Sequence, residues 1–106
     1  MKILFDQGTP VPLRRFLPGH IIDTAYERGW SELANGNLLS RAEQDGYELL
    51  ITTDRNLRYE QNLANRSIAI VVLMTTSWPR IRQQTERVQA IVDAIRPGTY
   101  QEIFIE

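Results

Sequence analysis

Cysteine is absent from the 106 residues, and histidine and lysine each occur once, as His20 and Lys2. Without cysteine the chain can form no disulfide, no thiolate metal site and no cysteine nucleophile. A single histidine excludes a histidine-rich zinc site and argues against a Ser-His-Asp triad. The groups left for chemistry are carboxylates, hydroxyls, amides and arginine side chains.

Long apolar runs are missing as well. The longest, Ile68 to Met74, has seven residues, whereas a helix needs about 20 to cross a bilayer. The N-terminus lacks the charged-then-apolar pattern of a signal peptide. We therefore expect a cytoplasmic, prokaryotic protein with no membrane partner. A hydrophobic fraction of 42% and a charged fraction of 24% fit one globular domain, residues 1–106, with a real core.

The cationic residues are almost all of one type, because eleven of the twelve are arginine. The planar guanidinium fork suits phosphates and carboxylates, so this bias mildly favours an anionic partner. A GC-rich genome would produce the same bias, and the net charge of −1 adds no further preference.

Strand-like and helix-like segments alternate along the chain. Runs of apolar and β-branched residues predict five strands, at Lys2–Phe5, His20–Ala25, Glu48–Thr53, Ser67–Thr75 and Tyr100–Ile105. Ile21 and Ile22 are expected to be buried, and the last strand to lie at an edge. Consecutive apolar residues are typical of strands covered on both faces. The order predicts an α/β fold, a three-layer sandwich with a mostly parallel sheet of about five strands and right-handed crossovers.

Four helical segments separate these strands, and we expect them over residues 10–17, 35–45, 57–64 and 79–96. Thr9 is predicted to cap the first helix, with Pro10 at its first position. Asn35 or Asn37 is predicted to cap the second. The last helix is expected to be continuous, with Val88 among the residues of its buried face.

Two aspartates directly follow two of these strands, Asp6 after the first and Asp54 after the third. In an open parallel sheet, ligands bind at the carboxyl ends of the strands. Adjacent strands would bring the two carboxylates within several ångströms, where like charges favour a bound cation or a raised pKa. The structural alternatives are an Asx turn for Asp6 and a helix cap for Asp54.

Hydroxyl and amide groups are expected at the same rim. The hydroxyls at the ends of the third and fourth strands belong to Thr52, Thr53, Thr75, Thr76 and Ser77. They would orient a water or contact a phosphate, although threonine also simply suits strands and serine suits turns. Asn35, Asn37 and Asn56 would supply neutral oxygen ligands, with capping and turn formation as their structural alternatives.

Several arginines fall in segments that begin near this end of the sheet, namely Arg55, Arg58, Arg66, Arg80 and Arg82. We predict that Arg55, Arg58, Arg80 and Arg82 bind nucleic acid through salt-sensitive phosphate contacts. The alternative is a solvated helix face on which arginines pair with Glu60 and Glu86.

Receiver domains of response regulators also carry an aspartate after the first strand and another after the third. They need paired acids after the first strand, where this chain has Asp6 followed by Gln7, and a lysine after the fifth. Because the only lysine is Lys2, this resemblance fails.

The better resemblance is to small stand-alone PIN-like proteins of prokaryotes, relatives of PIN-domain ribonucleases. The segment Met1-Lys2-Ile3-Leu4-Phe5-Asp6-Gln7-Gly8-Thr9-Pro10 resembles their opening strand, acid, turn and proline-started helix. The segment Asn35-Gly36-Asn37-Leu38-Leu39-Ser40-Arg41-Ala42 is similar to their middle helix. Leu50-Ile51-Thr52-Thr53-Asp54-Arg55-Asn56-Leu57 looks like their next strand and its acidic end. The likeness covers about residues 1–75, and the remainder fits in outline.

This resemblance implies a PIN-like fold, a site for Mg²⁺ or Mn²⁺ and RNA as the substrate class. By position, Asp6 and Asp54 would hold the metal, Asn37 would assist, and Thr53 or Thr76 would position water or phosphate. Many PIN proteins are toxins with an antitoxin partner, so an antitoxin-like protein is an expected partner.

The chain departs from the family pattern where Asn35, Asn37 and Asn56 replace acids. Glu32, Glu43 and Glu60 are the candidate replacements. The departures leave open a degenerate PIN-like module that binds RNA or a protein without cleavage, and a purely structural role. The apolar strand at Ile68–Met74 or the terminal edge strand is expected to serve a homodimer.

Overall fold

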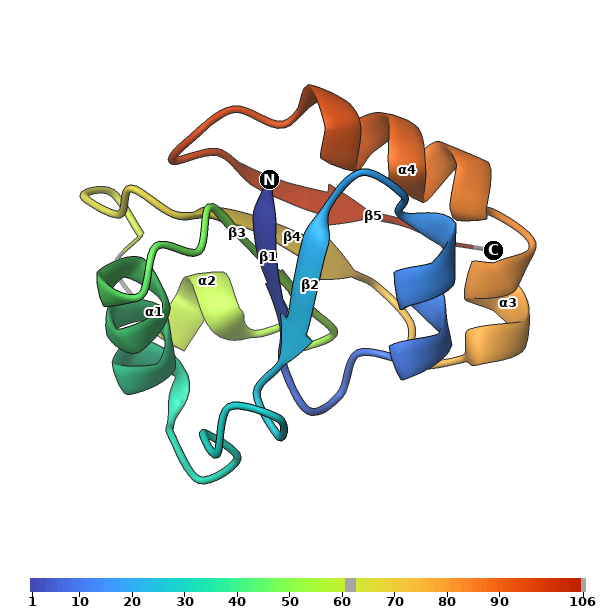
Figure 1. Cartoon of the computed structure of the whole chain (residues 1–106). Helices are drawn as coiled ribbons and strands as arrows, with labels where there is room; N and C mark the ends of the chain where they lie inside the picture. Colours follow the sequence, from blue (N-terminus) through green and yellow to red (C-terminus); the bar gives the residue numbers. More distant parts are fainter. Residues whose placement is uncertain (61–62, 106) are drawn as a thin grey trace.

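Residues 1–58 and 63–105 are described in full by a computed structural model, and residues 59–60 by their backbone. The strands are β1 (Lys2–Phe5), β2 (Ile21–Thr24), β3 (Leu49–Thr52), β4 (Ala69–Leu73) and β5 (Tyr100–Ile103). The helical elements are the 3₁₀ helix η1 (Val11–Phe16) and the helices α1 (Asn35–Gln44), α2 (Leu57–Glu60), α3 (Trp78–Arg82) and α4 (Thr85–Ala94) (Figure 1).

The five strands form one parallel sheet in the order β2-β1-β3-β4-β5. The expected α/β class with a five-stranded sheet is therefore confirmed. The chain moves from β1 outward to β2, then returns past β1 to add β3, β4 and β5 on the other side. The order consequently reverses between β1 and β3, which is the place where open α/β sheets bind ligands.

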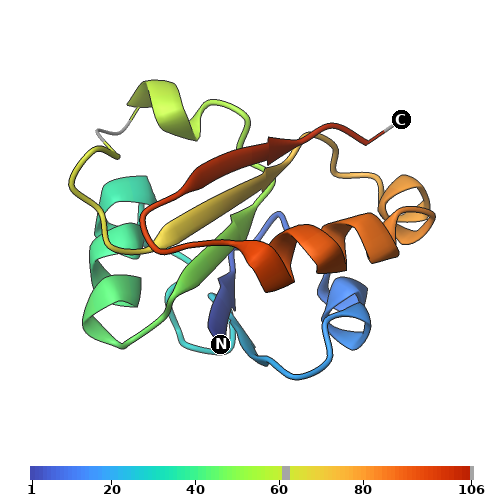
Figure 2. The ribbon, with the colours of Figure 1, turned by 90° about the horizontal axis from the view of Figure 1, so that it is seen from above.

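Helices cover both faces of the sheet (Figure 2). On one face η1, α3 and α4 bury the side chains of Leu13, Ile81, Val88 and Val92 against odd-numbered strand residues such as Phe5 and Val71. On the other face α1 and α2 bury Leu38, Leu39, Ala42 and Leu57 against even-numbered residues such as Leu4 and Leu50. Each fully buried leucine or isoleucine contributes about 1.5–3 kcal/mol, so the continuous apolar runs pin the sheet from both sides.

One of the four crossovers differs in hand from the others. The β1–β2 and β4–β5 connections pass over the same face, because η1, α3 and α4 share one core, yet they run in opposite directions along the sheet. The β2–β3 and β3–β4 connections use the opposite face and opposite direction to β1–β2, so they share its hand. The prediction of right-handed crossovers is therefore wrong for one connection, because α4 packs alongside η1.

Several element boundaries also differ from prediction. Ile21 is 66% exposed because it lies on the edge strand β2, whereas Ile22 is buried as expected. The predicted continuous last helix is divided into α3 and α4. Its first part closes with a hydrogen bond from Gln84 N to Ile81 O at 2.9 Å, and the Thr85 hydroxyl donates to Arg82 O at 3.5 Å, so local bonds replace the helical ladder.

Two further expectations change. The third helix ends at Glu60, its predicted course over residues 61–62 lies outside the described residues, and Leu63 and Ala64 are not helical. The strand within Ile68–Met74 cannot serve a dimer, because β4 lies between β3 and β5 and its side chains are buried. β5 does lie at an edge, as predicted.

Candidate functional site

The candidate site lies where β1 and β3 end, at the point where the strand order reverses. β1 delivers Asp6, and β3 delivers Thr52, Thr53 and Asp54 in succession. Register places Phe5 beside Ile51, so the two aspartates follow neighbouring strand ends, as the sequence predicts.

Asp6 is held by hydroxyl groups. The Thr52 hydroxyl donates a hydrogen bond to Asp6 Oδ2. The Thr9 hydroxyl lies 2.8 Å from Asp6 Oδ1 and 2.7 Å from the carbonyl oxygen of Ile51. Burial raises the pKa of the Asp6 carboxyl above 3.8, and the hydrogen bonds from Thr52, Thr9 and the backbone of Gly8 only partly offset this. A buried carboxylate of this kind gains from a nearby cation.

The predicted capping role of Thr9 is therefore wrong. Pro10 occupies the N-cap position of η1, without a side-chain cap, and η1 is a 3₁₀ helix. The Thr9 side chain, 3% exposed, points instead at the Asp6 carboxylate and the end of β3. The hydroxyl that the sequence assigns to helix initiation is thus part of the candidate site.

Asp54 is connected to Asp6 through Thr52. The backbone N–H of Asp54 donates to Thr52 Oγ1 at 3.0 Å, while that hydroxyl donates to Asp6. The Asp54 carboxylate accepts from the backbone N–H of Asn56 at 3.0 Å and from Asn35 Nδ2 at 3.0 Å. Asp54 therefore forms a local turn with Asn56 and also accepts a hydrogen bond from the side chain of Asn35 on α1.

The three asparagines predicted from the sequence as oxygen ligands lie in different places. Asn35 reaches Asp54 from the first position of α1, and its side chain caps no helix, since the N-cap of α1 is Ala34. Asn37 is exposed and is not among the residues that line the cavity containing Asp6 and Asn35. Asn56 contacts Asp54 through its backbone. Asn35, rather than Asn37, is thus the helix residue that touches the acidic pair.

The candidate replacement acids are placed elsewhere or not described. Glu43 binds Arg66 at 2.8 Å and accepts hydrogen bonds from Ser67. Glu32 is exposed, and the side chain of Glu60 lies outside the described residues. Among the described residues, no three His, Cys, Asp or Glu side chains gather as a metal-binding group.

Gly8 permits a close approach of the two strand ends. A Cβ atom at Gly8 would lie 2.4 Å from Thr53 Oγ1 and 3.9 Å from Asp6 Oδ1. Only a residue without a side chain allows the β1 loop and the Thr53 hydroxyl to meet in this way. Gly8 also lines a small cavity of about 150 Å³ beside Asp6, Trp30 and Asn35, which we call the Asp6 cavity.

Thr53 lines a second cavity of about 370 Å³. It is lined by Thr53, Arg55, Met74, Thr75, Thr76, Arg80 and Ile105, and we call it the hydroxyl–arginine cavity. The cavity therefore brings together three of the predicted hydroxyl residues and two of the predicted phosphate-binding arginines, namely Thr53, Thr75, Thr76, Arg55 and Arg80. Phosphate oxygens accept hydrogen bonds from hydroxyl and guanidinium groups.

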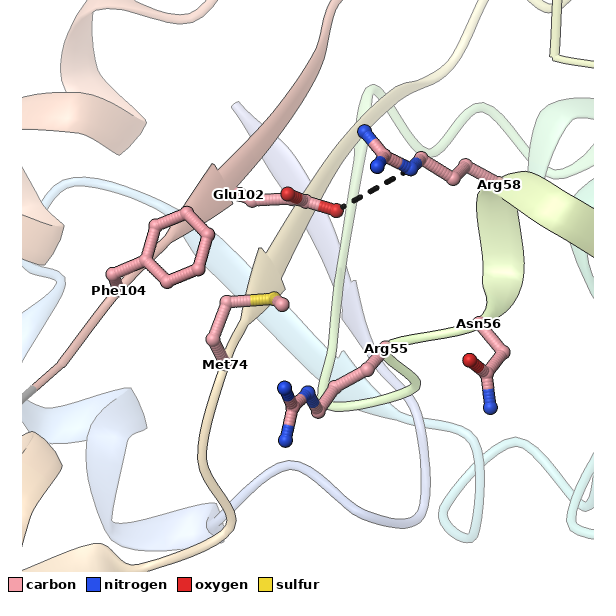
Figure 3. Close-up of a pocket in the computed structure, with 6 residues that line it drawn as sticks. All are labelled: Arg55, Asn56, Arg58, Met74, Glu102 and Phe104. Carbon is pink, nitrogen blue, oxygen red and sulfur yellow. Dashed lines mark ion pairs between the residues drawn. The ribbon is translucent and has the colours of Figure 1, made fainter.

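A third cavity of about 480 Å³ adjoins this one (Figure 3). Arg55 and Met74 line both, and Asn56, Arg58, Glu102 and Phe104 complete the third. We call it the Phe104 cavity. Arg58 lies here, with its Nε 3.7 Å from Glu102 Oε2. Arg82, the fourth predicted arginine, is exposed on α3 and lines neither cavity.

Comparisons with known protein families, with curated proteins and with solved structures found no match. Within the part of the chain that is described, no helix has the length and apolar character required to cross a membrane.

Proposed function

We propose that the protein is PIN-like and that the β1/β3 edge is a ribonuclease-type site, which binds RNA together with one Mg²⁺ or Mn²⁺ ion. The observation that carries this proposal is the connection of Asp6 to Asp54 through the Thr52 hydroxyl. It fixes two carboxylate residues at the switch point of the sheet, next to a cavity that carries hydroxyls and arginines.

The residues suit a single ion better than two. Mg²⁺ is commonly held by one or two carboxylates, with waters and substrate phosphates completing its coordination. Asp6 and Asp54 supply two carboxylates, and the described residues offer no group of three. A bound ion would neutralise charge on the phosphate and lower the pKa of a water molecule.

The protein's own side chains would position the RNA. Arg55 and Arg80 face the hydroxyl–arginine cavity, where they would neutralise phosphates that flank the reacting one. Thr53 and Thr76 would donate hydrogen bonds to phosphate oxygens in the same cavity. Asp6, which is mostly desolvated, would hold the cation and be stabilised by it in turn.

A second candidate function is RNA binding without cleavage, and a specific observation favours it. The carboxylates of Asp6 and Asp54 already accept hydrogen bonds from hydroxyl, amide and backbone donors. These donors stabilise the negative charge of the two carboxylates without a bound cation. An antitoxin-like protein partner is compatible with either function.

The test compares Asn35→Asp with Asn37→Asp in an RNA-cleavage assay with Mn²⁺. Asn35 contacts Asp54, so the first variant adds a third carboxylate to the site, whereas the second adds the same charge at an exposed position on the same helix. Cleavage by the unmodified protein supports the ribonuclease. Cleavage only by Asn35→Asp supports the degenerate module. If none of the three proteins binds or cleaves RNA, the proposed function is wrong.

A further inference from the structure

The Phe104 cavity is lined by an exposed aromatic ring, two arginines and a carboxylate, none of which contributes to holding Asp6 and Asp54. Phe104 follows β5 and its side chain is 60% exposed, although its neighbours Ile103 and Ile105 are buried. Its carbonyl oxygen accepts a hydrogen bond from Arg87 Nη1 at 2.5 Å. The backbone at Phe104 is thus anchored, and the exposed aromatic ring projects from it at the wall of the cavity.

The walls of this cavity are chemically distinct (Figure 3). Phe104 and Met74 supply apolar surface, Arg55 approaches from the β3–α2 connection, and Arg58 approaches from α2. Glu102 lies on β5 with its side chain 16% exposed. Its Oε2 accepts a hydrogen bond from the Tyr100 hydroxyl at 2.9 Å and pairs with Arg58, so the carboxylate is oriented by two neighbours.

A nucleobase matches this combination of groups. Aromatic rings stack on bases regardless of sequence, and arginines follow the backbone that carries them. A carboxylate has about four lone-pair positions, so Glu102 retains acceptor capacity beyond its two partners. It can accept from the amino group of adenine, cytosine or guanine, whereas uracil carries no amino group.

We infer that the Phe104 cavity is a nucleobase subsite, in which one unpaired base of an RNA strand stacks on Phe104 and donates its amino group to Glu102. The inference rests on the proposed RNA binding. Arg55 lines both this cavity and the hydroxyl–arginine cavity, so a strand whose phosphates lie against Arg55 and Arg80 places a neighbouring base here. A base within a duplex cannot reach Phe104, and the substrate class is therefore single-stranded RNA.

The test measures binding of fluorescent hexanucleotides of adenine, cytosine and uracil, with Ca²⁺ in place of Mg²⁺ to prevent turnover. The unmodified protein should bind the adenine and cytosine strands more tightly than uracil, and a duplex of the same length more weakly. Phe104→Ala should lower affinity for the adenine strand by about fivefold or more, because stacking on one aromatic ring contributes at least that much.

Matched variants separate stacking from other effects. Phe104→Tyr keeps the ring and should retain affinity, whereas Phe104→Leu keeps apolar volume and should lose it. Tyr26→Ala removes another exposed aromatic, 77% exposed after β2, and should bind normally. Glu102→Gln should reduce the preference for adenine over uracil while affecting uracil binding little.

The outcomes distinguish this inference from the function on which it rests. If the unmodified protein binds no RNA, the proposed function is wrong and the subsite with it. If the unmodified protein binds and Phe104→Ala binds equally well, the subsite alone is refuted. Equal binding of duplex and single strand also contradicts it.

Discussion

The hydroxyl of Thr52 donates a hydrogen bond to the carboxylate of Asp6, and the same oxygen accepts one from the backbone N–H of Asp54 at 3.0 Å. Thr52 is almost completely buried, at 1% exposure, so neither bond is readily replaced by water. One side chain on β3 therefore holds both the carboxylate of Asp6 and the backbone of Asp54.

Thr52→Val should test this coupling, since valine keeps the shape of the side chain and removes the hydroxyl. The loss leaves the Asp54 N–H without its acceptor and Asp6 with one donor fewer, which should cost about 1–3 kcal/mol of the free energy of unfolding. Chemical denaturation measures this cost. Thr52→Ser, which keeps the hydroxyl, should recover most of it, and a Thr52→Val protein as stable as the unmodified chain would refute the bridge.

Asp6→Asn should stabilise the protein at neutral pH. Burial raises the folded-state pKa of the Asp6 carboxyl above 3.8. The stability that the protonated carboxyl contributes is therefore fully present below pH 3.8 and is lost as the pH rises through the folded-state pKa. Asparagine avoids the cost of an ionised buried group. We expect the free energy of unfolding to rise by on the order of 1 kcal/mol. The midpoint of thermal unfolding should therefore rise by a few degrees.

The pH dependence provides the control for this stabilisation. The difference in midpoint between Asp6→Asn and the unmodified protein should be small at pH values below about 3.8 and grow toward neutrality. Glu32→Gln, at an exposed acid, should show no such trend. A lower midpoint for Asp6→Asn at neutral pH would contradict the burial argument.

Much of the fold is predictable from the sequence because local signals and the core agree. The consecutive apolar residues of β1, β3 and β4 predict strands covered on both faces, and the core confirms it. The hand of the β4–β5 crossover is not predictable, because it depends on α4 packing beside η1. The division between α3 and α4 at Gln84 is likewise set by terminal hydrogen bonds rather than by proline or glycine.

The candidate site is predictable where a strand end dictates position. Asp6 and Asp54 follow from their places after β1 and β3. The role of Thr9 is not predictable, because a threonine before Pro10 fits a helix cap as well as a residue of the site. Only the tertiary hydrogen bond to the carbonyl oxygen of Ile51 shows that the side chain belongs to the site. The choice of Asn35 over Asn37 depends on the rotation of α1 about its axis. The place of Phe104 beside a cavity is not predictable either, because an alternating strand at the end of the chain does not show which of its faces lines a cavity.

Glu43 should account for part of the stability that the protein loses at acid pH. Burial raises its pKa, but hydrogen bonds from Arg66, Ser67 and Ile68 outweigh it, so the folded-state pKa lies below 4.5. The stability that this carboxylate contributes is present above 4.5 and is lost as pH falls through the folded pKa. Glu43→Gln should cost about 1–3 kcal/mol at neutral pH.

Acid titration of stability distinguishes this effect from a general loss of packing. The gap between Glu43→Gln and the unmodified protein should narrow as pH falls below 4.5, and the Glu32→Gln control should run parallel to the unmodified protein. A gap independent of pH would show that the Glu43 charge is not responsible.

Arg55 and Arg80 should carry the salt dependence of RNA binding. Removing two phosphate contacts with single-stranded nucleic acid should reduce the slope of log affinity against log salt by about 1.4. Fluorescence anisotropy over a salt series measures the slope for the Arg55→Ala/Arg80→Ala double variant. Arg15→Ala, at an exposed arginine on η1, should leave the slope unchanged, and an equal decrease for Arg15→Ala would indicate diffuse attraction instead of a cavity.

The most direct measurement is calorimetric titration of Mn²⁺ into the unmodified protein, with the Asp6→Asn/Asp54→Asn double variant as the control. We expect binding of a single ion per chain by the unmodified protein and none by the double variant, whose fold should be intact by circular dichroism. Undetectable binding by the unmodified protein, or equal binding by both proteins, would show that the two aspartates joined through Thr52 do not form a cation site.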